Sequence, residues 1–203
     1  MTNQPRKRVR RSVEDSKQLI LETAERYLIA EGPNGVKVQR VAHDLGMTDA
    51  AVHYHFGNRD LLLEALLRFS GRRFVAELTA AIDESDEKTF DIDEAARLLS
   101  DLYDKRGTAR LAMWLILSGW SPKGSGMLEP LVDWLHKTKT RDARAAGLPA
   151  PAKKESRKQI AVLSAVTFTQ ALTGDAMLRS VNLTETSSDT LLSWVTTLLT
   201  KDA

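Results

Sequence analysis

The sequence contains no cysteine among its 203 residues, which excludes disulfide bonds and metal sites built on thiolates. This absence is consistent with a reducing compartment, and we expect a cytoplasmic protein. The chain also lacks any run approaching the roughly 18 consecutive apolar residues of a membrane span. Its basic start is not followed by the apolar stretch of a signal peptide. We therefore expect no association with a membrane.

The net charge is also small, but the charged residues are unevenly distributed along the chain. The formal net charge is +2, yet residues 1–60 carry 10 Lys and Arg against 8 Asp and Glu, whereas residues 61–203 carry 19 of each. The excess is most concentrated in residues 1–11, which hold five basic and no acidic residues. Two interpretations stay open for this segment: a solubilising tail, or an arm that binds DNA phosphates or a minor groove.

Apolar residues recur at helical spacing along the chain, which predicts an all-α fold of about nine helices. The content of 42% hydrophobic and 28% charged residues is typical of a globular protein. We expect helices at about residues 16–31, 38–45, 49–56, 59–82, 93–105, 110–120, 130–146, 155–179 and 188–201. The segment 110–120 is apolar nearly all round, which predicts burial on every side.

Two of these helices form a helix-turn-helix pattern. Apolar residues at helical spacing end at Gly46, which can adopt the positive φ of a tight turn, and the pattern resumes around Val52. Thr48 follows the turn as an N-cap, and Asp49 would support the same helix start through the helix dipole. The slim first turn of the second helix suits a DNA major groove. Packed helices in any all-α protein can give a similar pattern.

The segment Met47–Leu63, MTDAAVHYHFGNRDLLL, is more specific. It resembles the signature of the tetracycline-repressor (TetR) family, in which the recognition helix ends in His-Phe, here His55-Phe56, and a basic residue, here Arg59, opens the next helix. The resemblance covers about residues 16–66. It implies a three-helix DNA-binding domain with the helix-turn-helix (16–60) and a larger helical ligand-binding and dimerisation domain (61–203). The basic residues before them predict an N-terminal arm (1–15).

The resemblance also implies which residues bind DNA. Phosphate contacts are expected from Lys37, Thr48, His55 and Arg59, and base-edge contacts from Gln39, Asp49, Ala50, Ala51, His53 and Tyr54. Three of these positions depart from the family pattern. His53 replaces a tyrosine, Lys37 replaces a capping Thr or Ser, and Arg59 replaces a lysine, which keeps the charge and adds a planar fork.

The last two predicted helices, 155–179 and 188–201, carry apolar faces. These faces could close the core of one subunit, or they could form a homodimer interface, which the resemblance favours. A dimer also meets a functional need, because one helix-turn-helix covers few base pairs. A two-fold dimer reads an inverted-repeat operator in double-stranded DNA, with half-sites about 34 Å apart.

Large and adaptable side chains gather in residues 90–180. Each of them singly is explained by an ordinary core, but the resemblance implies a cavity among them that binds a small, mostly apolar effector. The expected ligand-binding residues are Tyr103, Met113, Trp114, Leu117, Trp120, Trp134, Phe168, Gln170 and Met177. His136 is a further polar group in this region.

Catalysis has little support in the sequence. The four histidines form no HExxH or comparable metal spacing, and the chain has neither a phosphate-binding glycine loop nor a cysteine nucleophile. We expect no enzyme activity, no metal and no cofactor. The predicted function is a DNA-binding transcriptional regulator, acting as a repressor released by a ligand. The alternatives are a helical ligand-carrier or protein-interaction module without operator recognition and, third, a small helical enzyme.

Overall fold

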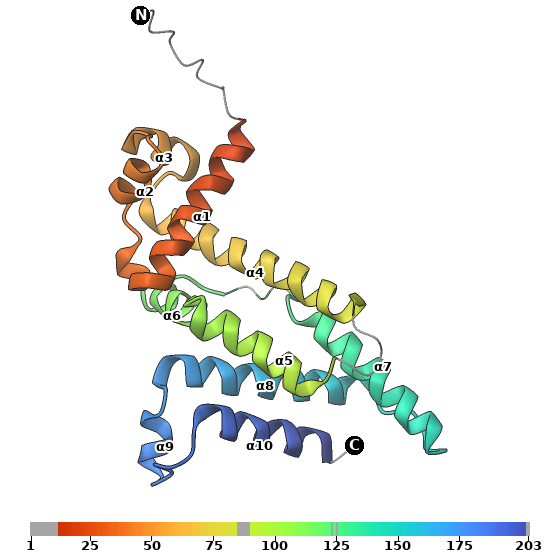
Figure 1. Ribbon diagram of the computed structural model, residues 1–203. Helices are drawn as coiled ribbons and strands as arrows, with labels where there is room; N and C mark the ends of the chain where they lie inside the picture. Colours follow the sequence, from red (N-terminus) through yellow and green to blue (C-terminus); the bar gives the residue numbers. More distant parts are fainter. Residues whose placement is uncertain (1–11, 85–89, 123, 125, 202–203) are drawn as a thin grey trace, which may run out of the picture. The chain divides into compact units, whose positions relative to one another are not determined.

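The computed structural model describes residues 12–84, 90–122, 124 and 126–201 (Figure 1). These residues form ten α-helices, one short 3-10 helix and one π-helical turn, with no strand in the described ranges. The predicted all-α fold is therefore confirmed. The chain divides into two compact units, an N-terminal unit that ends at Leu66 and a C-terminal unit that begins at Leu67. The basic segment 1–11 lies outside the described residues.

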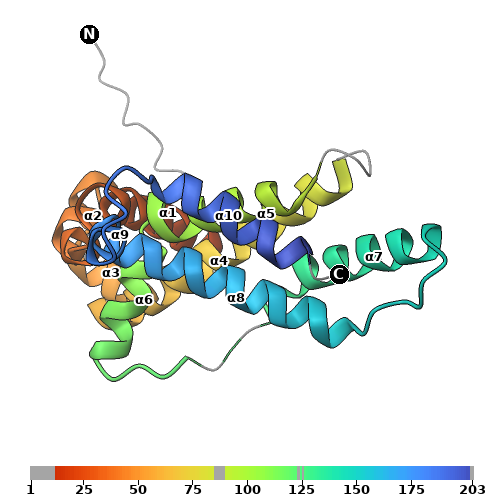
Figure 2. The ribbon, with the colours of Figure 1, turned by 90° about the horizontal axis from the view of Figure 1, so that it is seen from below.

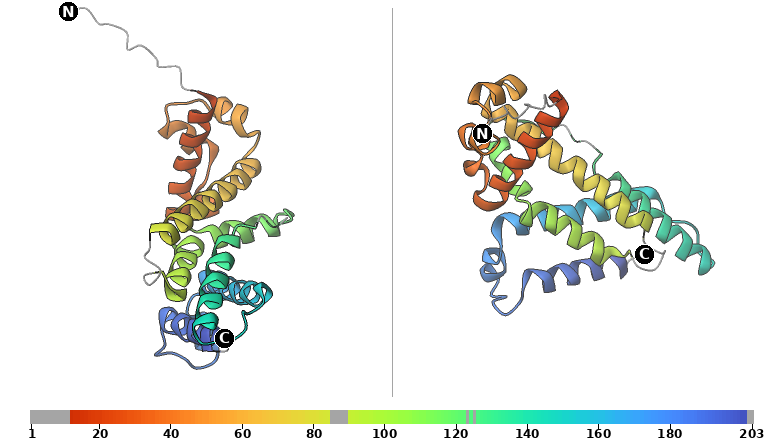
Figure 3. Two further views of the ribbon diagram at one scale, coloured as in Figure 1. Left: turned by 90° about the vertical axis from the view of Figure 1, so that its right-hand side faces the viewer. Right: turned by 45° about the horizontal axis from the view of Figure 1, so that its top comes forward.

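The N-terminal unit contains α1 (Val13–Glu31), the 3-10 helix η1 (Pro33–Gly35), α2 (Val38–Asp44), α3 (Asp49–Phe56) and the first turns of α4 (Arg59–Glu84). Figure 3 shows α1, α2 and α3 clustered together. Helix α1 begins earlier than the predicted Ser16, because Ser12 and Asp15 form a capping box. The Ser12 hydroxyl accepts the Asp15 N–H at 3.0 Å, and the Asp15 carboxylate accepts the Ser12 N–H at 3.3 Å.

The core of the N-terminal unit draws apolar side chains from each of its α-helices and from Val36. They are Ile20, Leu21, Ala24, Leu28, Val36, Val38, Val41, Ala42, Val52, Leu62, Leu63 and Leu66. The contributions are unequal, since Val52 is the single buried residue of α3. Burial of this shared apolar surface is what holds the short helices in place, because helices of seven or eight residues are marginal in isolation.

The C-terminal unit contains the rest of α4, then α5 (Ile92–Ser100), the π-helical turn η2 (Asp101–Lys105), α6 (Thr108–Leu117), α7 (Glu129–Ala145), α8 (Lys153–Thr173), α9 (Ala176–Ser180) and α10 (Ser188–Lys201). Helix α8 is central, with contacts to α5, η2, α6, α7 and α10. Figures 1 and 2 both show α8 and α10 side by side. The core includes Phe74, Leu99, Leu131, Ile160, Leu163 and Leu192.

Two predicted helices differ from the structure. The predicted helix 93–105 is α-helical only to Ser100 and continues as the π-helical turn. The predicted helix 155–179 is wrong as a single element, because α8 ends at Thr173. Gly174 adopts a φ of 52° and its N–H bonds to the carbonyl of Gln170 at 2.7 Å, which stops the helix. The separate α9 follows.

The predicted burial of segment 110–120 on every side is also wrong. Helix α6 ends at Leu117, and Gly119 takes a φ of 94° just beyond it. Leu117 is 80% exposed, and Ile116 is also exposed.

Within the described ranges, no helix combines the length and the apolar character that crossing a bilayer requires.

Candidate DNA-binding surface

The turn between α2 and α3 has the geometry of a helix-turn-helix. Gly46 adopts a φ of 62°, as predicted, and the Met47 N–H bonds to the Ala42 carbonyl at 2.9 Å. Ala42 and Val52 are each 1% exposed, so the two helices meet through small and medium apolar side chains. The turn therefore places α3 against α2 and leaves Asp49, Ala50, His53 and Tyr54 of α3 exposed.

The start of α3 is capped as predicted. The Thr48 hydroxyl accepts the backbone N–H of Ala51 at 3.2 Å, and Asp49 occupies the first turn. Thr48 itself is exposed. A hydroxyl that accepts a hydrogen bond still carries its own proton, so Thr48 can also donate to a phosphate oxygen.

The outer face of α3 is polar and aromatic. Asp49, Ala50, His53 and Tyr54 are exposed, and the exposed fraction of Tyr54 is 81%. His53 Nδ1 lies 2.7 Å from the carbonyl oxygen of Gly57. Since a carbonyl only accepts, Nδ1 carries the proton and donates, which leaves Nε2 as the ring nitrogen for another partner.

Two other predicted residues of α3 are less accessible. Ala51 is half-buried. His55 is half-buried, contacts the Tyr54 ring edge-on at a centroid distance of 5.3 Å, and has its Nδ1 enclosed without a hydrogen-bond partner among the described residues. On α2, Gln39 is exposed, and so is Lys37 at the N-cap position, where its side chain makes no capping hydrogen bond.

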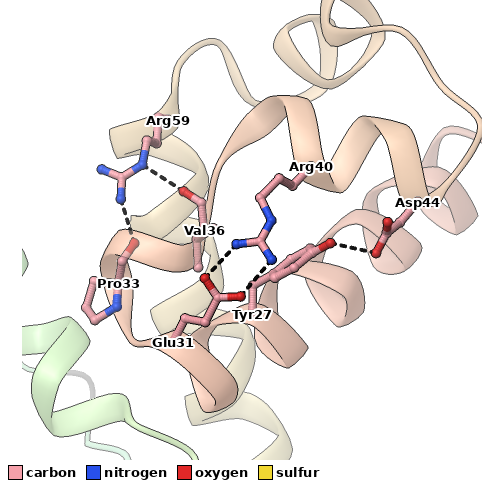
Figure 4. A network of polar contacts seen from close by, with 7 residues as sticks. All are labelled: Tyr27, Glu31, Pro33, Val36, Arg40, Asp44 and Arg59. Atoms are coloured by element: carbon pink, nitrogen blue, oxygen red, sulfur yellow. Dashed lines mark hydrogen bonds and ion pairs between the residues drawn. The ribbon is translucent and has the colours of Figure 1, made fainter.

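Arg59 opens α4 immediately after the cap residue Asn58. The predicted cap is confirmed, because the Asn58 side-chain oxygen accepts the Leu61 N–H at 2.9 Å. Figure 4 shows the Arg59 guanidinium directed toward the chain between α1 and α2: Nε donates to the Val36 carbonyl at 2.7 Å and Nη2 to the Pro33 carbonyl at 2.5 Å. The sequence predicts a phosphate contact for Arg59, whereas these two nitrogens bind backbone carbonyls.

A polar network joins α1 to α2. The Arg40 guanidinium forms two hydrogen bonds of 2.6 Å with the Glu31 carboxylate and lies 4.2 Å from the centre of the Tyr27 ring. The Tyr27 hydroxyl donates to Asp44 at 2.8 Å (Figure 4). The network thus fastens both ends of α2 to one helix, α1.

These contacts alter the acidity of the groups. The hydrogen bond from Tyr27 holds the pKa of Asp44 below its usual 3.8, and the same bond raises the pKa of the Tyr27 hydroxyl. The hydrogen bonds from Arg40 lower the pKa of Glu31. Both carboxylates therefore stay ionised near neutral pH. Sequence reasoning missed this network, because its partners lie 9 and 17 residues apart and no local pattern pairs them.

Three of the predicted ligand-binding residues lie at the core of the C-terminal unit. Tyr103 is buried, and its ring meets Phe168 edge-on at 5.3 Å. Trp134 meets Phe90 edge-on at 4.8 Å. The Tyr103 hydroxyl lies 2.7 Å from the Ser164 hydroxyl, and burial raises the pKa of Tyr103. This part of the unit therefore combines aromatic surface with one polar pair.

The other predicted ligand-binding residues are more dispersed. Half-buried positions are occupied by Met113, Trp114, Trp120 and Gln170, and the Gln170 amide donates to the Ser188 carbonyl at 3.3 Å. His136 is half-buried too, and its Nδ1 is enclosed without a hydrogen-bond partner in the described ranges. Leu117 and Met177 lie at the surface, with exposed fractions of 80% and 53%.

Known proteins resemble part of the chain in sequence. Residues 20–66 match the family model of bacterial regulatory proteins, tetR family. Over 67 residues the chain is 31% identical to the HTH-type transcriptional regulator BetI of Brucella canis, a match that covers 33% of this chain and 34% of that protein. The chain therefore matches about a third of the length of its curated relatives.

Solved structures resemble nearly the whole chain in fold. A TetR-family transcriptional regulator from Pectobacterium atrosepticum has a TM-score of 0.61 at 17% identity, covering 96% of this chain and 94% of that one. The structure of AibR in complex with isovaleryl coenzyme A and operator DNA has a TM-score of 0.52 at 16% identity, with coverages of 90% and 96%. At these identities the likeness concerns the fold.

Proposed function

We propose that the chain, whose residues 20–66 match the family model of bacterial regulatory proteins, tetR family, is a DNA-binding transcriptional regulator of that family, and that it is a repressor that a small molecule releases from its operator. The observation that carries the proposal is the exposed face of α3. Tyr54 is 81% exposed on a helix whose one buried side chain is Val52. Such a face adds little to the core and is well suited to a major groove.

The contacts of this face follow from its chemistry. The Gln39 amide can donate to and accept from an adenine, the Asp49 carboxylate can accept from a cytosine amino group, and the alanine methyls can meet a thymine methyl. His53 and Tyr54 complete the residues at base edges. The Lys37 ammonium, the Thr48 hydroxyl and the half-buried His55 are the proposed phosphate contacts.

We propose that the protein acts as a homodimer formed by α8 and α10. Trp194 and Leu198 stand one turn apart on α10 with exposed fractions of 59% and 45%, and Val162 on α8 is 47% exposed. A second copy would cover these side chains. The two helix-turn-helix motifs would then read the halves of an inverted repeat about 34 Å apart.

The dimer can be tested by sedimentation at micromolar concentration. Trp194→Glu should give a monomer, because it places a charge in the proposed interface while the residue is already 59% exposed in one subunit. Leu148→Glu is the matched control, since Leu148 is 61% exposed in the connection between α7 and α8. A monomeric unmodified protein would contradict the proposal.

We propose that the effector binds in the C-terminal unit and is small and mostly apolar. The aromatic surfaces of Tyr103, Trp134 and Phe168 support this, together with the polar Tyr103–Ser164 pair that could orient a ligand. The remaining proposed contacts are Met113, Trp114, Leu117, Trp120, Gln170 and Met177. Release from the operator requires a coupling free energy of typically about 1–3 kcal/mol.

The decisive experiment is selection of bound duplexes from random DNA by the full-length protein at near-physiological salt. We expect an inverted repeat with half-sites about one helical turn apart. Tyr54→Ala should abolish this specific binding. Recovery of no preferred sequence, with only salt-sensitive binding, would contradict the proposal and favour a ligand-carrier, in which Tyr54→Ala leaves ligand affinity intact.

The same duplex tests the role of residues 1–11 as an arm. Deleting them should lower affinity and flatten the dependence of log K on log salt, because five basic residues are lost. An unchanged slope would leave this segment as a solubilising tail.

A further inference from the structure

Arg59 connects the start of α2 to the end of α3 through hydrogen bonds. At one end α2 and α3 are joined through the covalent turn that contains Gly46. At the other end, the chain enters α2 through the segment 32–37 and leaves α3 through Gly57 and Asn58. Arg59 stands directly after the exit and donates to carbonyls of the entry segment. Arg59 therefore joins the two ends of the pair that the covalent turn leaves apart, as the bonds from Arg59 to Val36 and Pro33 in Figure 4 show.

The two hydrogen bonds are suited to a fixed geometry. Both are charge-assisted, with lengths of 2.7 Å to Val36 and 2.5 Å to Pro33, and both are partly buried. Val36 is 0% exposed. The Pro33 carbonyl also accepts the Val36 N–H at 3.3 Å, so Arg59 binds a backbone turn that is already ordered. A planar guanidinium holds two donors in one orientation, which a lysine ammonium does not.

The entry segment, residues 32–37, has no side chain that caps the start of α2. Lys37 occupies the N-cap position, and its side chain makes no capping hydrogen bond. Gly35 has no side chain, and a Cβ there would lie 2.4 Å from Glu31 Cβ, so this point of the turn lies hard against α1. The segment is thus held to α1 by packing and to α4 by Arg59.

We propose that Arg59 is a positioning residue, which sets the orientation of α2 and α3 for operator binding, and that it does not bind a phosphate. The proposal rests on the proposed operator-binding function. The Val36 and Pro33 carbonyls occupy the Nε–H and one Nη2–H of Arg59, so a phosphate would have to bind its remaining N–H groups without disturbing these two bonds. Recognition surfaces lose affinity when their elements move by about 0.5 Å or 10–20°, so a loosened entry segment weakens base contacts that Arg59 itself never makes.

Lysine at position 59 separates the two roles. Arg59→Lys keeps the positive charge that a phosphate contact needs but removes the planar fork. A phosphate contact predicts near-normal binding for Arg59→Lys and a weaker salt dependence for Arg59→Ala. A positioning role predicts that both variants lose specific affinity alike. Arg72→Lys, at an exposed position on α4, is the matched control for the exchange itself.

The experiment measures the affinity of full-length variants for the duplex that the unmodified protein selects from random DNA, and for a scrambled duplex of equal composition, at several salt concentrations. We expect Arg59→Lys to bind the selected duplex about tenfold or more weakly, the effect of losing one charged hydrogen bond. Its binding to the scrambled duplex and its salt slope should be unchanged, and Arg72→Lys should match the unmodified protein.

Normal specific binding by Arg59→Lys, together with a salt slope lowered by about 0.9 for each phosphate lost in Arg59→Ala, would overturn the proposal. Hydrogen exchange without DNA gives a second readout. Peptides from residues 33–45 should exchange faster in Arg59→Lys than in Arg72→Lys, and equal rates would overturn the positioning role. If Arg59→Ala does not fold, the affinity of Arg59→Lys for the selected duplex still distinguishes a positioning role from a phosphate contact. If the unmodified protein selects no duplex, the proposed function fails, and the exchange rates test Arg59 separately.

Discussion

Replacing Val52 with alanine should loosen α3 from the rest of the N-terminal unit. Val52 is 1% exposed and is the single buried residue of this helix. The substitution removes two buried methyl groups, each worth about 0.8 kcal/mol of transfer free energy. The residual cavity adds to this loss, so the free energy that holds α3 in place should fall by about 1.5–3 kcal/mol.

Val13→Ala is the matched control for this change. It removes the same atoms from α1 at a position that is 45% exposed. Because little apolar surface is buried there, its effect on stability should lie within about 0.5 kcal/mol. The difference between the two variants then measures the burial of Val52 and not the change of residue type.

Hydrogen exchange followed by mass spectrometry can localise the effect to α3. Peptides covering residues 45–57 should exchange about tenfold or more faster in Val52→Ala, since 1.4 kcal/mol corresponds to a factor of ten. The tryptophans provide an internal reference. All four of them, Trp114, Trp120, Trp134 and Trp194, belong to the C-terminal unit. The urea unfolding curve followed by their fluorescence should therefore be nearly the same for Val52→Ala and the unmodified protein. Equal exchange rates in Val52→Ala and Val13→Ala would refute the reasoning.

Three further predictions concern the contacts and turns around α2. Tyr27→Phe should lower the melting temperature at pH 7 by removing the hydrogen bond to Asp44. That bond lowers the pKa of Asp44 in the folded state below 3.8. Its contribution to the stability of the fold is therefore fully present above pH 3.8 and is lost as the pH falls through the lower pKa of the folded state. The melting temperatures of Tyr27→Phe and the unmodified protein should converge there. Gly35→Ala should destabilise by about 1–3 kcal/mol in urea unfolding, because its Cβ would meet Glu31 Cβ at 2.4 Å. Gly46→Ala has open space and should lose only about 1–2 kcal/mol from its positive φ; a larger loss than in Gly35→Ala would contradict this ranking.

The features that sequence reasoning predicted are those with local causes. The turn at Gly46, the cap at Thr48 and the cap at Asn58 each depend on a few neighbouring residues, and the structure confirms all three. The burial of Val52 follows from helical periodicity, which is local as well. The capping box at Ser12 has a local cause as well, because a serine is followed three residues later by a carboxylate.

The features that could not be predicted depend on contacts between distant segments. Arg59 reaches carbonyls 23 and 26 residues away, and no pattern in the sequence links them. The helix break at Gly174 was missed because a glycine is tolerated inside many helices, and only the path of the chain decides whether it stops one. The exposure of Leu117 likewise depends on where α6 ends relative to its neighbours.

Because Val52 is the single buried residue of α3, the surface chemistry of this helix and its contribution to the core depend on different residues. Ala50, His53 and Tyr54 can be exchanged without removing buried apolar area, because none of them belongs to the core. Changes at these positions alter the chemical surface that α3 offers, while the buried apolar area is unchanged and only His53 gives up a hydrogen bond, the one to the Gly57 carbonyl. If α3 reads DNA as proposed, a descendant of this chain can therefore acquire a different DNA preference through few substitutions that leave the buried core unchanged.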